Sequence, residues 1–509
     1  MKTLACLIFS ILLLALTACG GSSSTMPPPP PPPAVANASV TVRTNNGAAF
    51  DVAMSTSFQP AEWDYQFFQN FPSATTPLAN LQPNHIRLQG ISRGVPQGSE
   101  GTSSQAWDFA ILDAITQPVL GLGDHSPQFQ IAKAPAFLYT NKDSSSTFND
   151  PNFTQFADYA QNLVRYYNTG GFTPPGGSLL VSPAYPAYKI RYWGIYNEPS
   201  INNFLDPNPA VNAADYTAMY NTVVPAMHSV DNSIKFIALE MCCSSENWVP
   251  VFASNVTAQV DVVATHYYSS CNQRDSDAQV FSTVPGFVSS IQSIYGSLAT
   301  NPALANVHLW ITENNVNADF NTGNGGSACN PNQPFVDDTR GSSAFFAAWR
   351  PYVFSQIGRA GAKALYHWAF SGDAQFGEYN DSTGQIRLSY WVDYWLGQMF
   401  PANSGQVILN SNNSNSAQVE VLPVLNTDGS VVVLISNHAV ASAADNNGKG
   451  LTAKVSVDVN ALGPFTSASQ LTIDSSTSAS TGPNSVSISP ASAIAVTING
   501  YGTAILKLQ

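Results

Sequence analysis

Charged side chains are scarce in this sequence. Lys, Arg, Asp and Glu together make up 10% of its 509 residues, against about 25% in an average soluble protein. The surface must therefore consist mainly of Ser, Thr, Asn, Gln and Gly. The formal net charge is −13, with only 19 basic residues. Because a protein that follows a nucleic-acid backbone needs a stripe of positive charge, this composition excludes nucleic acid as a partner.

Membrane-spanning runs and metal-binding spacings are also missing. The apolar run near the N-terminus, Leu4 to Leu16, is shorter than the roughly 20 residues that span a bilayer. Neither Cys-x-x-Cys nor His-x-x-x-His occurs, which argues against a zinc site. We therefore predict no metal and no transmembrane helix.

The N-terminus has the pattern of an export signal. Lys2 precedes the apolar run, which ends in Leu16-Thr17-Ala18-Cys19 and resembles a bacterial lipobox, whose cysteine becomes lipid-modified. Seven consecutive prolines, at 27–33, predict an extended spacer. We expect residues 1–19 to be a lipoprotein signal and residues 20–46 a linker. The lipid would then be the only membrane contact of a body outside the cytoplasm. A secretory signal with an incidental cysteine is the alternative.

Four cysteines remain for the exported body, Cys242, Cys243, Cys271 and Cys329. In an oxidising compartment they are disulfide candidates, and four cysteines allow three pairings. Cys242 and Cys243 are adjacent, so they form either a vicinal bridge or two separate ones. A Cys271–Cys329 bridge is favoured because, in the fold predicted next, both residues lie in neighbouring loops.

Residues 47–400 alternate between strand-like and helix-like segments. The strand-like runs are 50–56, 85–89, 129–139, 189–196, 234–239, 260–266, 307–312 and 364–370. Amphipathic helical patterns lie between them, at 107–120, 153–167, 213–230, 284–299 and 344–359. Eight such units predict an α/β fold, a (β/α)₈ TIM barrel. A doubly wound open sheet is the alternative.

Residues 401–509 have a different texture. Short strand-like runs separated by Asn, Ser and Gly occur at 406–409, 418–425, 431–437, 451–459, 471–473, 486–489 and 493–508. No helical period of useful length is present, so we predict an all-β sandwich as a second domain. The alternation in Ala38–Arg43 predicts one more strand of that sandwich.

Glutamate is rare, and two glutamates stand where a barrel holds its chemistry. The chain has eight glutamates, and Glu198 and Glu313 end the fourth and seventh predicted strands. A buried strand end is a costly place for an unpaired carboxylate. Two carboxylates across a barrel mouth suit hydrolysis of a glycosidic bond. A separation of about 5–5.5 Å leads to retention of configuration, and one of about 6.5–9.5 Å to inversion.

Asn197-Glu198-Pro199, together with Glu313 at the end of strand seven, resembles clan A glycoside hydrolases. The resemblance is greatest to family 39 and its neighbours, families 30, 51 and 79. It implies retention, with Glu198 as general acid/base and Glu313 as nucleophile. It implies further site roles for four residues: Arg87 keeping the nucleophile ionised, Asn197 binding the sugar 2-hydroxyl, Tyr268 (or Tyr267) bonding the nucleophile, and Trp368 forming the floor under the sugar.

Three other side chains, His266, Glu240 and Glu378, are candidates for substrate contact. The expected substrate is an oligo- or polysaccharide with β-linked, xyloside-like units, and no cofactor is implied. The identity of the sugar, cleavage inside or at the end of a chain, and the oligomeric state all remain open.

Two other function classes compete with this interpretation. Residues 90–94, Gly-Ile-Ser-Arg-Gly, match the Gly-x-Ser-x-Gly pattern of serine hydrolases. That motif has to open a helix, which the following Val-Pro-Gln-Gly cannot do. The second alternative is a non-catalytic, carbohydrate-binding surface lipoprotein on a barrel scaffold. The presence of both glutamates argues against it.

Overall fold

The computed structural model describes residues 35–44, 47–58, 65–81, 85–90, 95–98, 104–122, 127–142, 146–201, 204, 209–242 and 245–509. The expected lipid-modified Cys19, the proline run, Arg93 of the serine-hydrolase pattern, and Cys243 lie outside these residues. Within the described ranges, no helix is both long enough and apolar enough to cross a bilayer.

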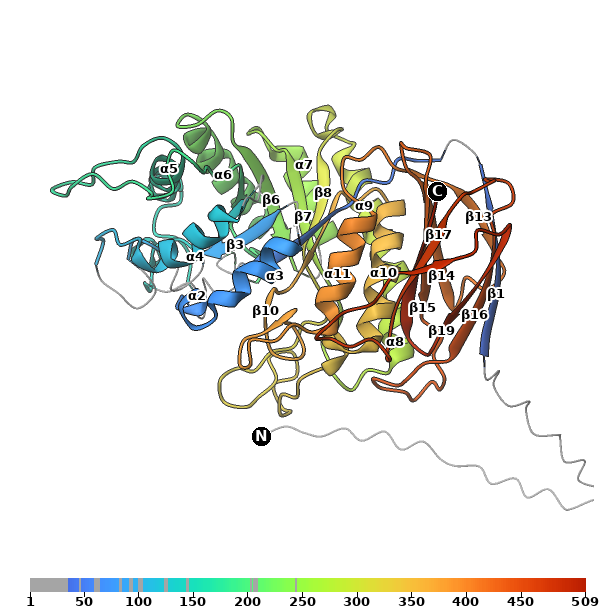
Figure 1. Ribbon diagram of the computed structural model, residues 1–509. Helices are drawn as coiled ribbons and strands as arrows, with labels where there is room; N and C mark the ends of the chain where they lie inside the picture. Colours follow the sequence, from blue (N-terminus) through green and yellow to red (C-terminus); the bar gives the residue numbers. More distant parts are fainter. Residues whose placement is uncertain are drawn as a thin grey trace, which may run out of the picture.

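Eight parallel strands close into a barrel (Figure 1). They are β2 (Ala53–Phe58), β3 (Ile86–Gly90), β4 (Gln128–Ile131), β5 (Tyr192–Ile195), β6 (Lys235–Met241), β7 (Val262–Ser270), β8 (His308–Asn317) and β9 (Ala364–His367). Each strand lies within or overlaps a predicted run. The closed order confirms the TIM barrel and excludes the doubly wound sheet.

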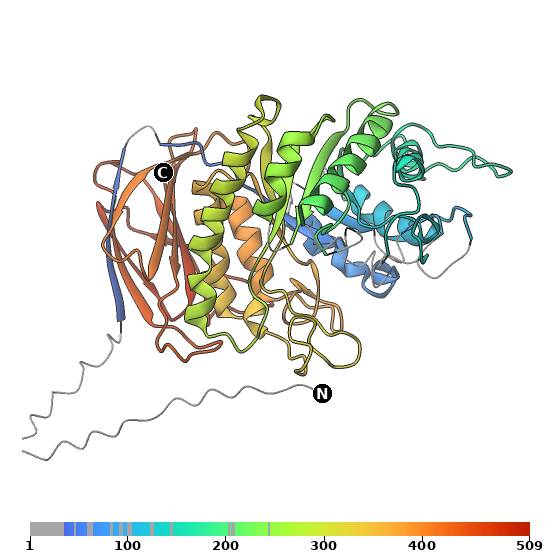
Figure 2. The same ribbon diagram turned by 180° about the vertical axis from the view of Figure 1, so that it is seen from behind.

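Helices surround the barrel (Figure 2). The five predicted helices are α4 (Ala110–Gly121), α5 (Thr154–Asn168), α6 (Pro209–His228), α9 (Val284–Leu298) and α10 (Ala344–Arg359). The structure adds α2 (Phe67–Asn70), α3 (Thr75–Asn80), α7 (Ser245–Asn255), α8 (Asp277–Ser282) and α11 (Leu388–Met399). One strand prediction was too long. β4 ends at Ile131, and the chain turns at Pro135 into a short 3₁₀ helix, Ala136–Leu138, because proline has no N–H for the ladder.

The C-terminal region forms two facing sheets, as predicted. One has the order β13-β1-β16-β19 and the other β12-β14-β15-β20-β17-β18. The strands are β1 (Val35–Arg43), β12 (Val407–Ile408), β13 (Asn410–Asn413), β14 (Val419–Leu425), β15 (Val431–Asn437), β16 (Thr452–Asp458), β17 (Ala468–Asp474), β18 (Val486–Ile488), β19 (Ala493–Ile498) and β20 (Gly502–Leu508). The strand expected over Ala38–Arg43 is β1, which pairs in parallel with β16.

The predicted run 493–508 is two strands in different sheets. Gly500 separates them with a φ of +74°, a left-handed conformation that favours glycine. A Cβ at this position would lie 2.2 Å from the Lys449 carbonyl oxygen. The break at Gly500 therefore lets the chain cross from one sheet to the other.

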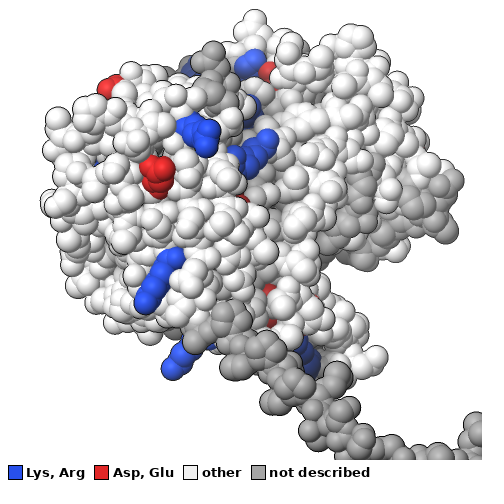
Figure 3. Space-filling model, turned by 90° about the vertical axis from the view of Figure 1, so that its right-hand side faces the viewer, with Lys and Arg blue, Asp and Glu red and all other residues white. Residues whose placement is uncertain are grey.

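The barrel and the sandwich share one core. Helix α10 packs against β15 and β20, and Leu422, Leu434 and Ile505 of the six-stranded sheet belong to the same buried cluster as the barrel side chains. The Ser436 hydroxyl also donates to the Ala348 carbonyl across this junction, at 2.6 Å. The face seen from the sandwich side carries only scattered charged groups (Figure 3), in keeping with the composition.

Candidate active site

Glu198 is aimed into the barrel mouth by an unusual turn after β5. Tyr196 and Glu198 have φ values of 71° and 45°, a left-handed region that non-glycine residues rarely adopt and that clusters at functional sites. Two contacts hold the turn. The Glu198 amide donates to the Glu240 carbonyl at 3.0 Å, and the Tyr196 hydroxyl lies 3.0 Å from that of Tyr139.

Glu313 stands on β8 between a cation and a phenol. Its Oε1 accepts from Arg87 Nη1 at 2.9 Å, and its Oε2 accepts from the Tyr268 hydroxyl at 2.9 Å. Burial raises the pKa of Tyr268 well above its usual value, so the phenol stays protonated and can donate. Both oxygens of the Glu313 carboxylate are therefore held by donors.

His266 lies between the two glutamates. Its Nδ1 is 2.9 Å from Glu198 Oε1 and 3.4 Å from Glu313 Oε2. A carboxylate oxygen of Glu198 and one of Glu313 lie within 4.8 Å of each other. This proximity depends on an irregularity, since the β7–β8 register shifts between Thr265 and His266 and sets His266 opposite Glu313.

Burial sets the protonation of this group. It raises the pKa of Glu198 to about 7, although the charge of Arg87 opposes the shift. It lowers the pKa of His266 to about 4. Near neutral pH the imidazole is therefore uncharged, and a large fraction of Glu198 holds its proton.

Arg87 is fully buried and organises the base of the site. Besides Glu313, its guanidinium donates to Glu240 Oε2 at 2.9 Å, Gln89 Oε1 at 2.6 Å and Asn197 Oδ1 at 2.8 Å. Two carboxylates balance one buried cation, a compensation that a buried charge requires. Arg87 thus positions Glu313 and Asn197. Because it is fully buried, it does not contact the substrate directly.

Glu240 lies in the barrel interior and does not face the cleft as the sequence had suggested. A register shift in β6 between Ala238 and Met241, with φ of 42° at Glu240, turns the side chain inward. The backbone of Gly194 on β5 makes the necessary space, since a Cβ there would lie 2.0 Å from Glu240 Oε1. The side chain is fully buried and forms an ion pair with Arg87.

Two glutamines complete the support and were missed in the sequence. Gln130 Nε2 donates to Asn197 Oδ1 at 2.8 Å, and Gln128 Nε2 to Glu240 Oε1 at 3.2 Å. Their spacing in the sequence could have indicated this role, because residues two positions apart on a strand face the same side of the sheet. With its Oδ1 held by both Arg87 and Gln130, the side chain of Asn197 directs its amide group the other way.

Trp368 follows β9 and lies beside Arg87, whose guanidinium carbon is 5.8 Å from the ring centroid. Its side chain is 7% exposed. The structure thus brings together Glu198, Glu313, Arg87, Asn197, His266, Tyr268 and Trp368. Tyr267, the weaker alternative to Tyr268, points away: its hydroxyl bonds Ser269 and Thr283.

The expected substrate contact of Glu378 is wrong. Its side chain is 0% exposed and its Oε2 accepts from Thr56 Oγ1 of β2 at 3.0 Å. Burial, together with the negative charge of Asp393 on α11, raises its pKa well above the usual value. Asp393 in turn pairs with Arg350 at 2.9 Å and with His367 at 2.7 Å. Glu378 therefore belongs to a polar network between the barrel and its helices.

Two groups of described residues have the spacing of metal ligands: Glu198, His266 and Glu313, and His367, Glu378 and Asp393. In the first, Arg87 already neutralises Glu313, and in the second Arg350 neutralises Asp393. A cation at either place would have to compete with a buried guanidinium.

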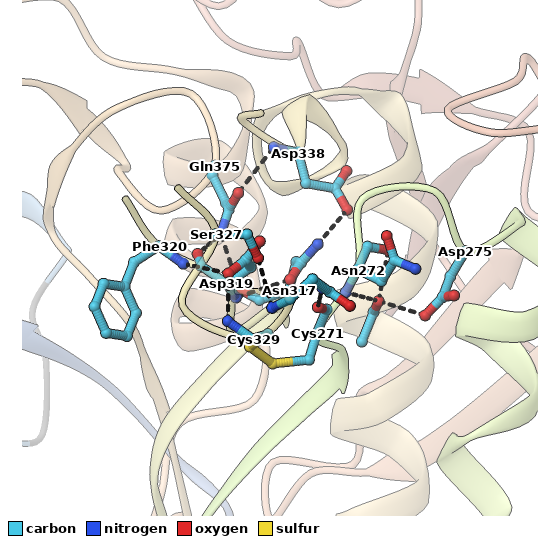
Figure 4. The surroundings of a disulfide bond; sticks show 12 residues. Cys271, Asn272, Asp275, Asn317, Asp319, Phe320, Ser327, Cys329, Asp338 and Gln375 are labelled. Carbon is cyan, nitrogen blue, oxygen red and sulfur yellow. Dashed lines mark hydrogen bonds between the residues drawn. A yellow bond between two sulfur atoms is a disulfide. The ribbon is translucent and has the colours of Figure 1, made fainter. Parts of the chain in front are cut away.

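A disulfide braces one side of the mouth (Figure 4). Cys271 and Cys329, in the loops after β7 and β8, are bonded, with their Cα atoms 5.8 Å apart. The Cys329 amide also donates to Asp319 Oδ1 at 2.9 Å. Phe320 points away from this cluster and is 54% exposed. Cys242 is also disulfide-bonded, and Cys243 is outside the described residues.

Comparison with known proteins places the fold. No family model and no curated protein matches the sequence, whereas many solved structures resemble it. The catalytic domain of the family 30 xylanase C from Talaromyces cellulolyticus is 16% identical, with a TM-score of 0.57 over 92% of this chain and 99% of that one. A family 51 arabinofuranosidase from Xanthomonas axonopodis pv. citri is 13% identical, with a TM-score of 0.62 over 93% and 100%.

A third similar structure is the family 39 β-xylosidase from Caulobacter crescentus. It is 12% identical, with a TM-score of 0.57 over 92% of this chain and 99% of that one. At such low identity the likeness concerns the fold. The chain thus shares the barrel-and-sandwich fold of these glycoside hydrolases, which confirms the fold implied by the family resemblance.

Proposed function

We propose that the protein is a retaining glycoside hydrolase. The observation that carries this proposal is the pair of carboxylates at the barrel mouth, with one oxygen of Glu198 and one of Glu313 within 4.8 Å of each other. Carboxyl groups this close suit direct attack by one of them, whereas an inverting enzyme needs a wider gap for water. The fold shared with glycoside hydrolases supports the same reading.

In the first step Glu313 attacks the anomeric carbon while Glu198 gives its proton to the leaving oxygen. The carbon–oxygen bond to the leaving group breaks, and a glycosyl ester on Glu313 forms. Hydrogen bonds from Arg87 and Tyr268 hold the two carboxylate oxygens of Glu313 in position for the attack. The raised pKa of Glu198 keeps the proton available.

In the second step Glu198, now ionised, takes a proton from water, and the resulting hydroxide attacks the anomeric carbon. The ester bond to Glu313 breaks and both carboxyl groups return to their starting states. Two inversions at one carbon give net retention. The uncharged His266, 2.9 Å from Glu198 Oε1, can hold that carboxyl in position in both states.

For the substrate we propose a β-linked, xyloside-like glycoside. The structures similar to this one include a xylanase and a β-xylosidase. Trp368 offers an aromatic surface for the apolar face of a sugar ring, and the amide of Asn197 can donate to a ring hydroxyl. No side chain in this proposal requires a cofactor.

The test is hydrolysis of a panel of aryl β- and α-glycosides by the full chain. We expect one sugar to be cleaved with retention, and Glu313→Ala and Glu198→Gln to lower the rate at least about 10³-fold, the scale on which loss of a catalytic group acts. Added azide should rescue Glu313→Ala to a glycosyl azide of inverted configuration. It should rescue Glu198→Gln to an azide of retained configuration on activated substrates.

Glu378→Gln serves as the control, because Glu378 is a buried glutamate of the same barrel that contacts neither Glu198 nor Glu313. It should retain the kinetics of any fraction that folds. Hydrolysis by Glu313→Ala at the wild-type rate would contradict the assignment. Binding of oligosaccharide without cleavage of any panel member or polysaccharide would favour the non-catalytic alternative.

We also propose that Cys19 carries a lipid and anchors the protein to a membrane outside the cytoplasm. The lipobox-like residues before Cys19 and the proline run behind it support this proposal. Cells expressing the full gene should incorporate labelled palmitate into the protein, and Cys19→Ser should abolish the incorporation. Equal labelling of the Cys19→Ser variant would rule it out.

A further inference from the structure

A second cavity opens on the flank of the barrel, at a site that contains neither Glu198 nor Glu313. Its volume is about 440 Å³, within the range of small-molecule sites. Helix α5 forms one wall. The remaining lining comes from the segments after β3 and β4 and from the loop after α5, which projects at the left of Figure 1.

The α5 wall is a row of polar side chains. Gln155, Asp158 and Asn162 follow at spacings of three and four residues, so they share one helix face with about 5–6 Å between neighbours. Gln155 and Asp158 are exposed, and in the described part of the chain neither side chain makes a hydrogen bond. Asn162 Oδ1 accepts from Arg165 Nη1 at 2.7 Å, which leaves its amide hydrogens to face the cavity.

The rest of the lining includes aromatic side chains. Phe137 is partly exposed, and its ring stacks on no other ring among the described residues. Trp107 and Phe172 stand beside it in the lining and brace each other edge to face, with centroids 4.8 Å apart. Trp107 also stacks on Tyr159 of α5, with centroids 5.5 Å apart. The lining therefore combines aromatic rings with a row of hydrogen-bonding groups.

Phe137 is linked to the turn that carries Glu198 through Tyr139 and Tyr196. Phe137 is two residues before Tyr139, whose hydroxyl lies 3.0 Å from that of Tyr196. Tyr196 is in turn two residues before Glu198. The segments after β3 and β4 leave the same end of the barrel that holds the glutamates.

We propose that this cavity is a second saccharide-binding site, which holds a segment of the polymer whose bond is cleaved at Glu198 and Glu313. The apolar C–H face of a sugar ring can pack on the aromatic side chains of the lining, and its hydroxyl groups can hydrogen-bond to the polar ones. The lining has one carboxylate and one guanidinium, so it lacks the cluster of cations that a phosphate would need. The inference rests on the proposed function, because it takes the polymer as substrate.

The test compares polymer binding with cleavage of a small substrate. Gln155→Ala/Asp158→Ala and Phe137→Ala are made in the full chain, with Gln292→Ala/Ser293→Ala, an exposed pair on α9, as matched control. Retardation in gels containing soluble arabinoxylan, arabinan or mixed-linkage β-glucan is measured on the Glu313→Ala background, so that the polymer is not cut. Cleavage of an aryl glycoside is measured on the wild-type background.

We expect Gln155→Ala/Asp158→Ala to weaken retardation at least fivefold in the polymer that binds, with kcat/KM for the aryl glycoside unchanged. The control pair should match its parent in both assays. Unchanged retardation, or no retardation of the parent by any of these polymers, would overturn the second site even if the glycoside is hydrolysed. If Gln155→Ala/Asp158→Ala weakens retardation but the wild-type chain hydrolyses no glycoside, the second binding site is supported and the proposed function is rejected.

Discussion

Two glutamates of the same chemical type have different surroundings in this site. Glu313 accepts hydrogen bonds from a guanidinium and a phenol, one on each carboxylate oxygen. Glu198 faces the uncharged imidazole of His266, and desolvation raises its pKa to about 7. Different surroundings are what an acid and a nucleophile in one site require.

This difference predicts the pH dependence. A general acid acts in its protonated form, so kcat/KM for an aryl glycoside with a poor leaving group should fall as pH rises through about 7. That limb should be absent in Glu198→Gln, and also for a dinitrophenyl glycoside, whose leaving group needs no proton. The measurement is the pH profile from 5 to 9 for both substrates. A limb of equal size for both substrates would assign it to a group other than Glu198.

At the scale of elements, β7 and β8 shape the mouth. Both strands run past the catalytic residues, to Ser270 and Asn317, and the loops that follow are tied by the disulfide. Asn330 Nδ2 also donates to the Cys271 carbonyl at 2.8 Å. The disulfide and this hydrogen bond hold the long loop after β8 in one position. Apart from isolated β-bridges, that loop, which the structure describes in full, has no regular secondary structure before the 3₁₀ turn at Thr339–Ser342.

Removing the disulfide should therefore loosen the wall and destabilise the fold. A bridge that closes a loop of 58 residues contributes up to about 4 kcal/mol by the chain-entropy relation. We expect Cys271→Ser/Cys329→Ser to lower Tm and to raise KM more than it lowers kcat, because the catalytic pair lies on the strands. Thermal melts and kinetics check this. Each single variant should match the double, and an unchanged Tm without reductant would contradict the prediction.

At the scale of the whole molecule, the sandwich is part of the barrel's core. Side chains from its six-stranded sheet join the buried cluster around α10, and the Tyr501 hydroxyl donates to Asp277 Oδ2 at 3.1 Å. The first strand, β1, also comes from the opposite end of the chain. The sandwich thus covers apolar surface that the barrel alone would expose.

A chain ending at residue 400 should accordingly fail to fold. Exposure of the α10 face removes hydrophobic burial that contributes about 25 cal/mol per Å². The free energy of unfolding of a domain is small, so this loss is a large part of it. We expect the truncated chain to be insoluble or without a cooperative melt, while the full chain unfolds in one transition. Circular dichroism and calorimetry measure this. A truncated barrel that melts cooperatively near the full-length Tm would show independent domains.

Much of the architecture could be predicted from the sequence, because strand and helix periodicity are local properties. The barrel strands and the sandwich followed from such patterns. Five helices were not predicted, namely α2, α3, α7, α8 and α11; among them, α11 is rich in aromatic residues with weak helix preference. The strand prediction over 493–508 missed the break at Gly500, since a crossing between sheets leaves little trace in hydrophobicity.

The sequence by itself determined which residues could carry the chemistry, because scarce glutamates at strand ends stand out against a weakly charged chain. Only the tertiary structure decided what surrounds them. The separation of Glu198 and Glu313, the inward turn of Glu240 and the burial of Glu378 depend on bulges and on contacts between residues more than a hundred positions apart. Periodicity records which way a side chain faces from its own strand. It does not record what the neighbouring strand brings to meet it.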